Sequence, residues 1–586
     1  MIKYFYNLIT KKDLNHLIFL FLGMFVAAAI EMIGLSAIPV FIMMIVDSKK
    51  LINIFSNSFI NNYIQNLERS EQIIFGASFL IIIFFLKNIY LSFYYYFQTK
   101  VTGVLRQNIS TKLFFKYINA EYKFHINNNP SILTRNIINS VNGTVNVIIS
   151  SLTIAKESLI LLVIFLLLLL NEPIVSVTVF LFLIFFSGSF ILFTKKILTY
   201  RGKNYELLRE KQLKIINHSF GSIRETKILN KENYLINIFN KNLNKMEDQL
   251  FYLTFLGQVP KLFLEFIAVF SLASLSIIFI MLNLTTEQIL PLISLIAVCS
   301  IRLIPAFNLI LSSLSARRFS IESVKIISNE FKIEQDNLII RDKNISLKKK
   351  IFSNKIEFKN VYFSHENSGK NILENISFSI NLGEKIGIIG KSGSGKSTLV
   401  DLILGLIKPT QGKILIDDFD INENLQIWQR SIGYIPQDIY LLDDTIKNNI
   451  ALGIDPEEIN NELLLNAIKL SSLESYINSL EQKENTNIGN RGIKVSGGQK
   501  QRIGFARALY HNPKVLILDE ATSSLDSSTE KKVMDDIYKA SNDKTMIIIT
   551  HKHNSIYNCD KVLLLNDGKI IDQGIFSEIK KRQLFL

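Results

Sequence analysis

The chain has 586 residues, of which 48% are hydrophobic and 20% are charged, and its mean hydropathy is +0.26. This length is too great for one ordinary domain, and this hydropathy excludes an ordinary soluble globular protein. The apolar residues fill long runs before about residue 315 and alternate with polar residues after it. The sequence therefore predicts a membrane domain followed by a soluble domain.

The net charge of +14 is concentrated in two stretches, residues 100–135 and 195–245, and both lie between apolar runs. Cytoplasmic loops of membrane proteins have this excess of Lys and Arg. A nucleic-acid-binding surface is the alternative explanation, but the placement of the charge disfavours it. We therefore expect cytoplasmic loops and no nucleic acid partner.

Six apolar segments are long enough to cross a membrane, since a helix needs about 20 apolar residues to do so. The loops that follow the odd-numbered segments are short or balanced in charge, whereas the loops that follow the even-numbered ones are long and basic. The N-terminus, with Lys3, Lys11 and Lys12, is therefore predicted to be cytoplasmic. The six segments are residues 16–46, 73–98, 144–170, 174–195, 252–282 and 287–315.

The loops between these segments carry helical patterns of their own. In the two long basic loops, the pattern on both sides of a polar break predicts membrane helices that extend into the cytoplasm and end in short coupling helices. A solvated surface is the alternative there. The loop after the first segment has an amphipathic pattern over about residues 51–67, which predicts a helix on the outer membrane surface or one packed on neighbouring spans.

Charged residues inside the predicted spans are costly and indicate function. Lys156 and Glu157 are adjacent, and Lys261 and Glu265 are four residues apart, so the opposite charges in each pair can partly neutralise each other. Arg302 has no such partner nearby in the sequence, and its place in mid-span favours a water-filled cavity, where it would hold an anionic cargo, over an interface. The charged residues are Glu31, Lys87, Lys156, Glu157, Lys261, Glu265 and Arg302.

A glycine-rich loop over residues 390–398 follows the apolar strand Ile386–Ile389 and precedes a helical pattern. The loop matches the phosphate-binding pattern G-x-x-x-x-G-K-[ST] in the strand–loop–helix context that this pattern requires. Its backbone N–H groups would converge on phosphates at a helix N-terminus. Lys396 would neutralise the β- and γ-phosphates of ATP, and Ser397 would hold Mg²⁺. The predicted phosphate-binding residues are Gly390, Ser392, Gly393, Gly395, Lys396, Ser397 and Thr398.

Two adjacent carboxylates end a second apolar strand, which begins at Val515. Asp519 fits the role of organising Mg²⁺ in a nucleotide-binding protein. Glu520 points the other way on a strand and can polarise the water that attacks the γ-phosphate. A single carboxylate at a strand end would be unremarkable, but this pair accompanies a phosphate loop. The soluble domain is therefore predicted to hydrolyse ATP.

Between these two motifs, residues 495–499 read Val-Ser-Gly-Gly-Gln. They resemble the signature sequence of ATP-binding cassette proteins, with Val495 where Leu is usual. In that family the signature of one subunit closes over ATP bound to the phosphate loop of the other. The resemblance implies that Ser496, Gly497, Gly498 and Gln499 contact ATP across a dimer interface. It therefore also implies a homodimer that uses ATP and Mg²⁺.

Other elements of the cassette family follow in the family's order. Gln437 resembles the Q-loop residue that senses Mg²⁺, and His551 resembles the switch histidine on the γ-phosphate, so both join Glu520 as predicted catalytic residues. Asp526, in Ser-Ser-Leu-Asp, resembles the D-loop aspartate. Two departures stand out. His365 takes the place of the usual adenine-stacking Tyr, and Asn490 takes the place of a common Glu in the exporter-specific loop.

The resemblance covers nearly the whole chain and implies its domain organisation. It implies a six-helix all-α transmembrane domain over residues 1–320, a linker over 321–351 and an α/β P-loop nucleotide-binding domain over 352–586. The chain would sit in the bacterial cell (inner) membrane with the nucleotide-binding domain in the cytoplasm. ATP binding and hydrolysis would drive transport by alternating access.

The charged membrane residues resemble a narrower group, the bacterial flippases for lipid-linked oligosaccharides. In that group, basic residues on the cavity wall bind the pyrophosphate of the lipid carrier. The resemblance implies that Lys87, Lys261 and Arg302 bind substrate and that a lipid-linked anionic glycan is the cargo. Lys stands where the group has Arg at two of these positions, and Leu309 replaces a further basic residue. A general lipid or multidrug exporter is the alternative, whereas a cassette protein that regulates a channel without transport is disfavoured by Glu520.

Overall fold

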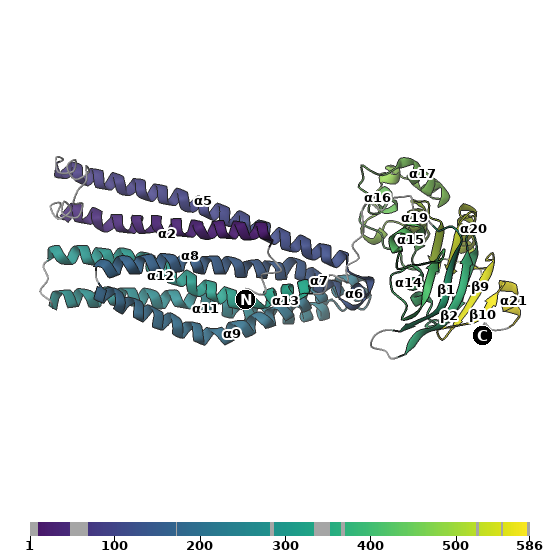
Figure 1. Cartoon of the computed structure of the whole chain (residues 1–586), viewed down its shortest axis with the longest axis horizontal. Helices are drawn as coiled ribbons and strands as arrows, with labels where there is room; N and C mark the ends of the chain where they lie inside the picture. Colours follow the sequence, from purple (N-terminus) through teal and green to yellow (C-terminus); the bar gives the residue numbers. More distant parts are fainter. Residues whose placement is uncertain are drawn as a thin grey trace. The chain divides into compact units, whose positions relative to one another are not determined.

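The computed structural model describes residues 10–46, 68–171, 173–281, 286–332, 352–364, 370–522, 527–552 and 555–582. Its contacts divide the chain into two units, with the division between residues 339 and 340. The described part of the first unit is built of helices, and the second combines helices with β-sheets (Figure 1).

Long helices build the first unit. A helix of 50 residues is about 75 Å long, more than twice the roughly 30 Å of a membrane's hydrocarbon core. Helices of this length therefore extend beyond the membrane, as the basic loops predict. The long helices are α2 (Lys11–Val46), α5 (Arg69–Ile118), α8 (Val141–Asn171), α9 (Pro173–Gly221), α11 (Glu232–Met281) and α12 (Thr286–Phe319).

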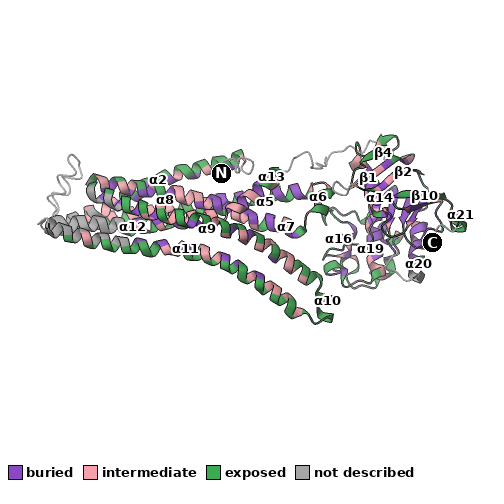
Figure 2. Ribbon diagram, turned by 90° about the horizontal axis from the view of Figure 1, so that it is seen from below, coloured by how far each residue is buried: buried purple, intermediate pink, exposed green. Residues whose placement is uncertain are grey.

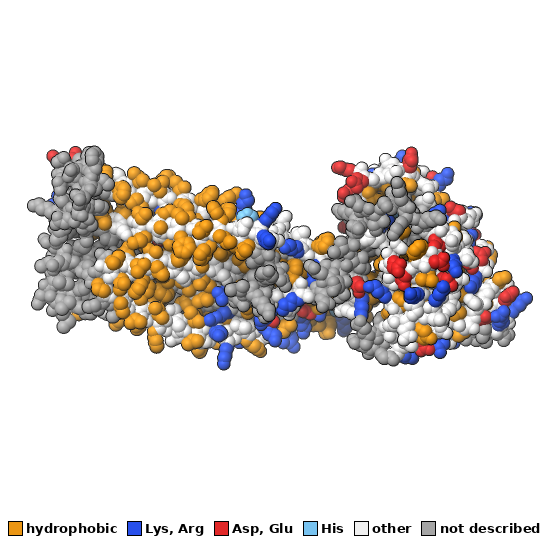
Figure 3. Space-filling view, in the orientation of Figure 1, with side chains coloured by type: hydrophobic (Ala, Val, Ile, Leu, Met, Phe, Trp, Pro, Cys, Tyr) orange, Lys and Arg blue, Asp and Glu red, His pale blue; other side chains and the backbone are white. Residues whose placement is uncertain are grey.

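Four helical segments have the length and hydropathy of a membrane span over the described residues: Lys11–Ile42, Arg69–Ile118, Pro130–Leu170 and Phe180–Gly221. The remaining two predicted spans fall in α11 and α12, where many side chains lie outside the described part. The count of six spans therefore stays a prediction. Hydrophobic side chains cover the long helices on the face shown in Figure 3, and Lys and Arg gather toward one end.

Short helices connect the long ones. The segments α6 (Tyr122–Asn127) and α10 (Ile223–Ile228) lie between α5 and α8 and between α9 and α11, where coupling helices are predicted. Between α6 and α8 lie α7 (Pro130–Arg135) and the π-helix η1 (Asn136–Ser140). The predicted external helix, over residues 51–67, lies outside the described residues.

The first residues of the predicted linker belong to the helical unit instead. They form α13 (Ile321–Lys332), which packs on α8, α9 and η1. Val324 and Ile327 are fully buried there because their three-residue spacing gives the helix one apolar face. The rest of the predicted linker lies outside the described residues.

Two sheets build the second unit. The larger has the strand order β10-β9-β3-β8-β7-β6, in which β9, β3, β8, β7 and β6 run parallel, and the smaller is antiparallel with the order β2-β1-β4-β5. The strands predicted before the phosphate loop and before the carboxylate pair are confirmed as β3 and β7. The strands are β1 (Lys355–Ser364), β2 (Asn371–Asn381), β3 (Lys385–Gly390), β4 (Gln411–Ile416), β5 (Phe419–Asp420), β6 (Ile432–Ile435), β7 (Val515–Asp519), β8 (Thr545–Ile549), β9 (Lys561–Asn566) and β10 (Lys569–Gly574).

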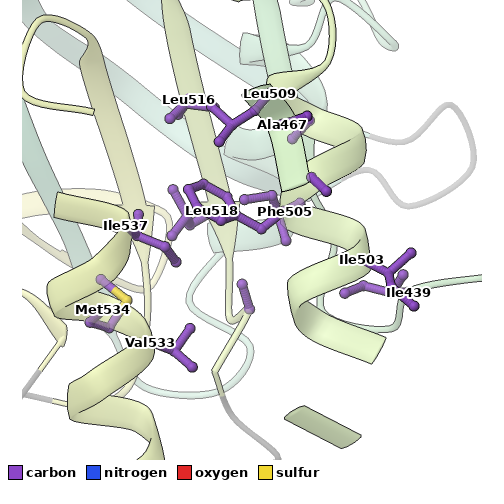
Figure 4. Packing of buried hydrophobic residues seen from close by; sticks show 14 of the residues in the cluster. Ile439, Ala467, Ile503, Phe505, Leu509, Leu516, Leu518, Val533, Met534 and Ile537 are labelled. Atoms are coloured by element: carbon purple, nitrogen blue, oxygen red, sulfur yellow. The ribbon is translucent and has the colours of Figure 1, made fainter. Parts of the chain in front are cut away.

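The central strands of the larger sheet, β9, β3, β8 and β7, are buried on both faces, as their apolar sequences require, whereas the edge strand β10 is not (Figure 2). Alternate residues of β7 face opposite cores: Leu516 and Leu518 pack with α19 and α20 (Figure 4), whereas Ile517 packs with α14. The helices are α14 (Lys396–Ile403), α15 (Leu425–Arg430), α16 (Ile446–Ile450), α17 (Asn461–Leu470), α18 (Glu474–Asn478), α19 (Gly497–Leu509), α20 (Ser527–Ala540) and α21 (Phe576–Lys581), with 3₁₀ turns η3 (Lys483–Asn485) and η4 (Asn490–Gly492).

Candidate functional site

The glycine-rich loop joins β3 to α14, as its sequence predicts. Gly395 caps the N-terminus of α14 with a φ of +101°, a conformation that side chains other than glycine rarely adopt. Lys396 opens the helix and is nearly buried, and its Nζ donates hydrogen bonds to the carbonyls of Gly390 (2.8 Å) and Lys391 (2.9 Å). These bonds hold the ammonium group within the loop. The next residue, Ser397, is exposed at the first turn of α14.

Gly390 leaves no space for a side chain. A Cβ there would lie against the Leu565 carbonyl oxygen and 2.7 Å from Ser394 Oγ. We expect Gly390→Ala to destabilise the second unit by roughly 1–3 kcal/mol, the usual cost of overpacking, and to weaken ATP binding. Thermal unfolding and ATP titration would measure both effects. Gly497→Ala is the control for stability, because a Cβ at Gly497 meets nothing within 4 Å. Equal stability of the two variants would contradict the prediction.

The predicted metal-binding carboxylate, Asp519, ends β7 at the same edge of the sheet as the phosphate loop, because β3, β8 and β7 are parallel. Burial raises the pKa of Asp519, and so does neighbouring Glu520, whereas the hydrogen bond from Tyr434 and the charge of Lys396 lower it. Binding of a cation in place of the proton would therefore stabilise this carboxylate.

The three predicted catalytic residues meet at this edge. Glu520 follows β7 with a φ of +47°, and its N–H donates to the Ile549 carbonyl at the end of β8 (2.8 Å). Gln437 Nε2 donates to Glu520 Oε2 (2.9 Å), and His551 Nδ1 lies 3.4 Å from Glu520 Oε1. The carboxylate is therefore held from two sides by groups that the sequence places 83 and 31 residues away.

The signature residues occupy the N-terminus of α19. Ser496 is its N-cap: its hydroxyl accepts from Gln499 N (3.3 Å), and Gln499 Oε1 accepts from Ser496 N (2.8 Å). The side chain of Gln499, predicted to contact ATP, thus completes a capping box. Gly497 and Gly498 form the first turn, where N–H groups favour an anion. The helix packs on β6, α16 and α17.

The signature and the phosphate loop of one chain belong to different parts of the larger sheet. The phosphate loop follows β3, whereas α19 packs on β7 and β6, which are two and three strand positions away in the sheet. Neighbouring strands lie about 4.8 Å apart, so β3 and β6 are separated by about 14 Å. Within the part of the chain that the structure describes, no hydrogen bond or ion pair joins Ser496 to residues 390–398.

Two predicted site residues lie outside the described part of the chain, and two residues without a predicted role lie near the site. His365 and Asp526 lie outside the described residues. Tyr434 donates to Asp519 Oδ2 (3.3 Å) but has no predicted role. Its position three residues before Gln437 is the sequence signal that could have identified it. Asp401, on α14, is a second residue without a predicted role. Burial and the charge of Asp519 raise its pKa to about 6, and it lies five positions after Lys396.

Five of the seven charged residues in the predicted spans form a largely buried cluster across α2, α5, α8 and α12. Glu31, with 3% of its side chain exposed, lies 2.7 Å from Arg302 Nε and 3.2 Å from Lys87 Nζ. Arg302 Nη2 also lies 3.3 Å from Glu157, which pairs with Lys156 at 3.0 Å as predicted. Lys87 and Arg302, which lack partners nearby in the sequence, thus share a carboxylate from another helix.

Lys261, the third predicted substrate residue, stands apart from this cluster. It pairs with Glu265 on α11 (3.8 Å), as its spacing predicts, and both side chains are half exposed. Among the described residues, no ion pair links it to Lys87 or Arg302. The structure of one chain therefore brings together only two of the three predicted substrate residues.

Loss of Glu31 should destabilise the membrane unit. Glu31→Gln removes a buried charge from between two partly buried cations, and the cost approaches the roughly 3–5 kcal/mol of breaking a fully buried ion pair. We expect a clear fall in the unfolding temperature of the detergent-solubilised chain. The control is Glu232→Gln, whose pair with Lys227 is exposed to solvent and therefore contributes little to stability. If both variants unfold at the wild-type temperature, the cluster does not hold the helices together.

Comparisons with known proteins agree with this architecture. Residues 373–523 match the family model of the ABC transporter. The chain is 40% identical over 230 residues to the leukotoxin export ATP-binding protein LtxB of Aggregatibacter actinomycetemcomitans (39% of this chain, 32% of that protein). It is 35% identical over 259 residues to the putative multidrug export ATP-binding/permease protein YgaD of Bacillus subtilis (44% of each). The aligned region thus spans less than half of either relative.

The fold extends the likeness over the whole chain. A solved bacterial Atm1-family ABC exporter with ATP bound superposes with a TM-score of 0.78 over 96% of each chain, at 20% sequence identity. The family match covers the phosphate loop, the signature and the carboxylate pair, and the fold match covers both units. Residues 373–523 therefore match the ATP-binding domain of ABC transporters, and the chain has the fold of an ABC exporter.

Proposed function

We propose that this chain is one half of an ATP-driven exporter and works as a homodimer. The observation that carries the proposal is the arrangement of Glu520, Gln437 and His551 beside the phosphate loop, with the signature on a helix that packs on β7 and β6 rather than on β3. One chain supplies the parts of two half-sites. Two copies facing each other would assemble each phosphate loop with the partner's signature.

The residues around the phosphate loop suit ATP with Mg²⁺. Lys396 and the N-terminus of α14 would bind the phosphates. Ser397, Asp519 and Gln437 offer hydroxyl, carboxylate and amide oxygens, which are the donors that Mg²⁺ prefers. Bound Mg²⁺ would neutralise charge on the β- and γ-phosphates. The fit of these donors supports the predicted metal site.

Hydrolysis would depend on Glu520. Its carboxylate, held by Gln437 and His551, would orient the attacking water and accept its proton. Closure of the partner's Ser496 over the γ-phosphate would complete the site only when two copies come together. Closure and reopening would then move the long helices and alternate the access of a membrane cavity. The expected setting is the bacterial cell membrane, with the N-terminus and the ATP-binding domain in the cytoplasm.

The function is tested with the purified full chain in lipid nanodiscs. We expect particles that contain two copies, measured by mass, and Mg²⁺-dependent ATP hydrolysis by those particles. Monomeric particles that hydrolyse ATP would contradict the composite site. Dimers without any hydrolysis would contradict the ATPase.

For the cargo, we propose a polyprenyl-pyrophosphate-linked glycan that is flipped across the membrane. The support is the charged cluster on four helices. Its three cations and two carboxylates leave one net positive charge, which favours an anionic group. Lys87 and Arg302 are already paired with Glu31, so a phosphate group would have to compete with this carboxylate. A lipid or multidrug exporter is the second candidate, favoured by the multidrug export relative.

Arg302→Ala separates these two cargo proposals. For a lipid-linked glycan, we expect at least a tenfold loss of flipping in reconstituted vesicles while much of the ATP hydrolysis remains, because Arg302 would contact the pyrophosphate. Lys325→Ala, which removes an exposed cation on α13, is the control. Unchanged flipping by Arg302→Ala would contradict the glycan proposal. Stimulation of ATP hydrolysis by hydrophobic cationic drugs would support the alternative.

A further inference from the structure

A buried carboxylate on α20 joins the two loops that carry Glu520 and His551. This residue, Glu530, is 2% exposed, although it lies on a helix whose sequence is mostly polar. Its partners come from the segment after β7 and from the segment after β8. None of the predicted catalytic or nucleotide-binding residues is Glu530 or one of these partners.

Both oxygens of Glu530 are used. Oε1 accepts hydrogen bonds from Thr522 Oγ1 (3.0 Å) and Ser555 Oγ (2.6 Å). Oε2 lies 3.3 Å from Lys552 Nζ, and the same Nζ donates to the Thr522 carbonyl (3.2 Å). Thr522 is two residues after Glu520, and Lys552 directly follows His551. Glu530 and Lys552 together therefore tie the two loops to each other.

This network joins the two loops beyond the point where strand pairing in the sheet ends. Strand β7 ends at Asp519 and β8 ends at Ile549, so Glu520 and His551 both lie beyond the paired strands. The hydrogen bond from Glu520 N to Ile549 is one link between the loops at this level. Within the segment after β8, the Lys552 N–H donates to Thr550 Oγ1 (2.9 Å), which holds the Lys552 backbone in place.

Burial of a carboxylate is costly unless it is paired and hydrogen-bonded. Thr522 and Ser555 are themselves buried, so removing the carboxylate would leave two hydroxyls without this acceptor. A polar network of this kind, with its members satisfied, specifies one arrangement of the groups around it. Here the groups around it include the two loops of the proposed catalytic centre.

We propose that Glu530 is a positioning residue for ATP hydrolysis, which sets the Glu520 carboxylate against the His551 imidazole through Thr522 and Lys552. The inference rests on the proposed ATPase function and adds a residue that touches neither ATP nor the attacking water. Its effect is on the geometry of the water-activating pair, so it concerns the hydrolytic step and leaves the binding of ATP unchanged.

The test measures steady-state ATP hydrolysis by the full chain in nanodiscs. We expect Glu530→Ala to lower kcat by roughly 10- to 100-fold, the effect of misplacing a catalytic group by about 1 Å, with KM for ATP within about twofold. Glu530→Gln keeps an oxygen that accepts from Thr522 and Ser555 and should recover much of kcat. Lys552→Met, which removes the charge that bridges the loops, should also lower kcat without changing KM.

A matched control separates positioning from loss of stability. Lys544 is a buried lysine in the same unit, bonded to Asn512 Oδ1 (2.7 Å) and the Pro513 carbonyl (3.1 Å) at the opposite end of β8. Lys544→Met should lower the unfolding temperature but leave the kcat of the folded protein unchanged. If Glu530→Ala does not fold, Lys552→Met carries the test.

The outcomes are distinct. Wild-type kcat in Glu530→Ala, or in Lys552→Met if the alanine variant does not fold, would overturn the positioning role and leave the ATPase proposal intact. A fall in kcat that Lys544→Met reproduces at equal loss of unfolding temperature would overturn it as well. No hydrolysis by the wild-type chain would overturn the ATPase proposal, and this inference with it.

Discussion

Glu520→Gln is expected to slow ATP hydrolysis by roughly 10²- to 10⁴-fold, the usual contribution of a general base. The amide has nearly the shape of the carboxylate but cannot accept the proton of the attacking water. The phosphate loop is unchanged in this variant, because Lys396 is held by the carbonyls of Gly390 and Lys391. ATP binding should therefore remain, and the variant should accumulate as an ATP-bound dimer.

Two measurements check this expectation: the rate of phosphate release, and the amount of ATP retained after gel filtration. Glu374→Gln is the matched control, since Glu374 is an exposed carboxylate of the same unit that pairs with Lys569. The control should hydrolyse ATP at the wild-type rate. Full activity in Glu520→Gln would remove the assigned role of Glu520.

Lys396→Ala should weaken ATP binding by roughly 100-fold, since it removes charge-assisted hydrogen bonds to the phosphates, each worth about 1.5–3 kcal/mol. The Lys396 ammonium is already held within the loop, so its side chain loses little conformational entropy when ATP binds to the wild-type chain. Titration with a fluorescent ATP analogue measures the affinity. Lys391→Ala removes an exposed cation of the same loop and should change affinity by less than about threefold. Equal affinities of the two variants would refute the placement of the phosphates.

Local pattern was enough to predict the motifs of the nucleotide site. A short apolar strand, a glycine-rich loop and a helical pattern are consecutive in the chain, so β3, the loop and α14 follow from neighbouring residues. The same holds for β7 and the carboxylates at its end. The distance between Glu520 and His551 does not follow from local pattern, because it depends on β7 and β8 lying side by side in the sheet.

Pairing across helices was the main feature that the sequence could not supply. Spacing along one helix predicted the ion pair of Lys261 with Glu265, which the structure has. Arg302 and Glu31 are 271 residues apart, and only the packing of α12 near α2 makes them partners. From the sequence alone, Arg302 has no nearby partner and is predicted to be free to bind a cargo, whereas in the structure it is paired with carboxylates of other helices.

Polar residues on amphipathic helices were missed for a related reason. Glu530 lies in the polar sequence of α20, where a carboxylate is normally solvated. Its burial results from the two loops that fold over it, and these come from other parts of the chain. The apolar face of α13 is short, and a stretch of 12 residues between two domains resembles a linker until its packing partners are known.

A mixing experiment tests the central claim, that two copies build each ATP site. Lys396→Ala disables the phosphate loop, and Ser496→Arg blocks the signature, so each variant alone should be inactive. A mixed dimer contains one site made of two intact halves. Random mixing of equal amounts should therefore restore ATP hydrolysis to about a quarter of the wild-type rate. Hydrolysis that stays at the level of the separate variants would contradict the composite site.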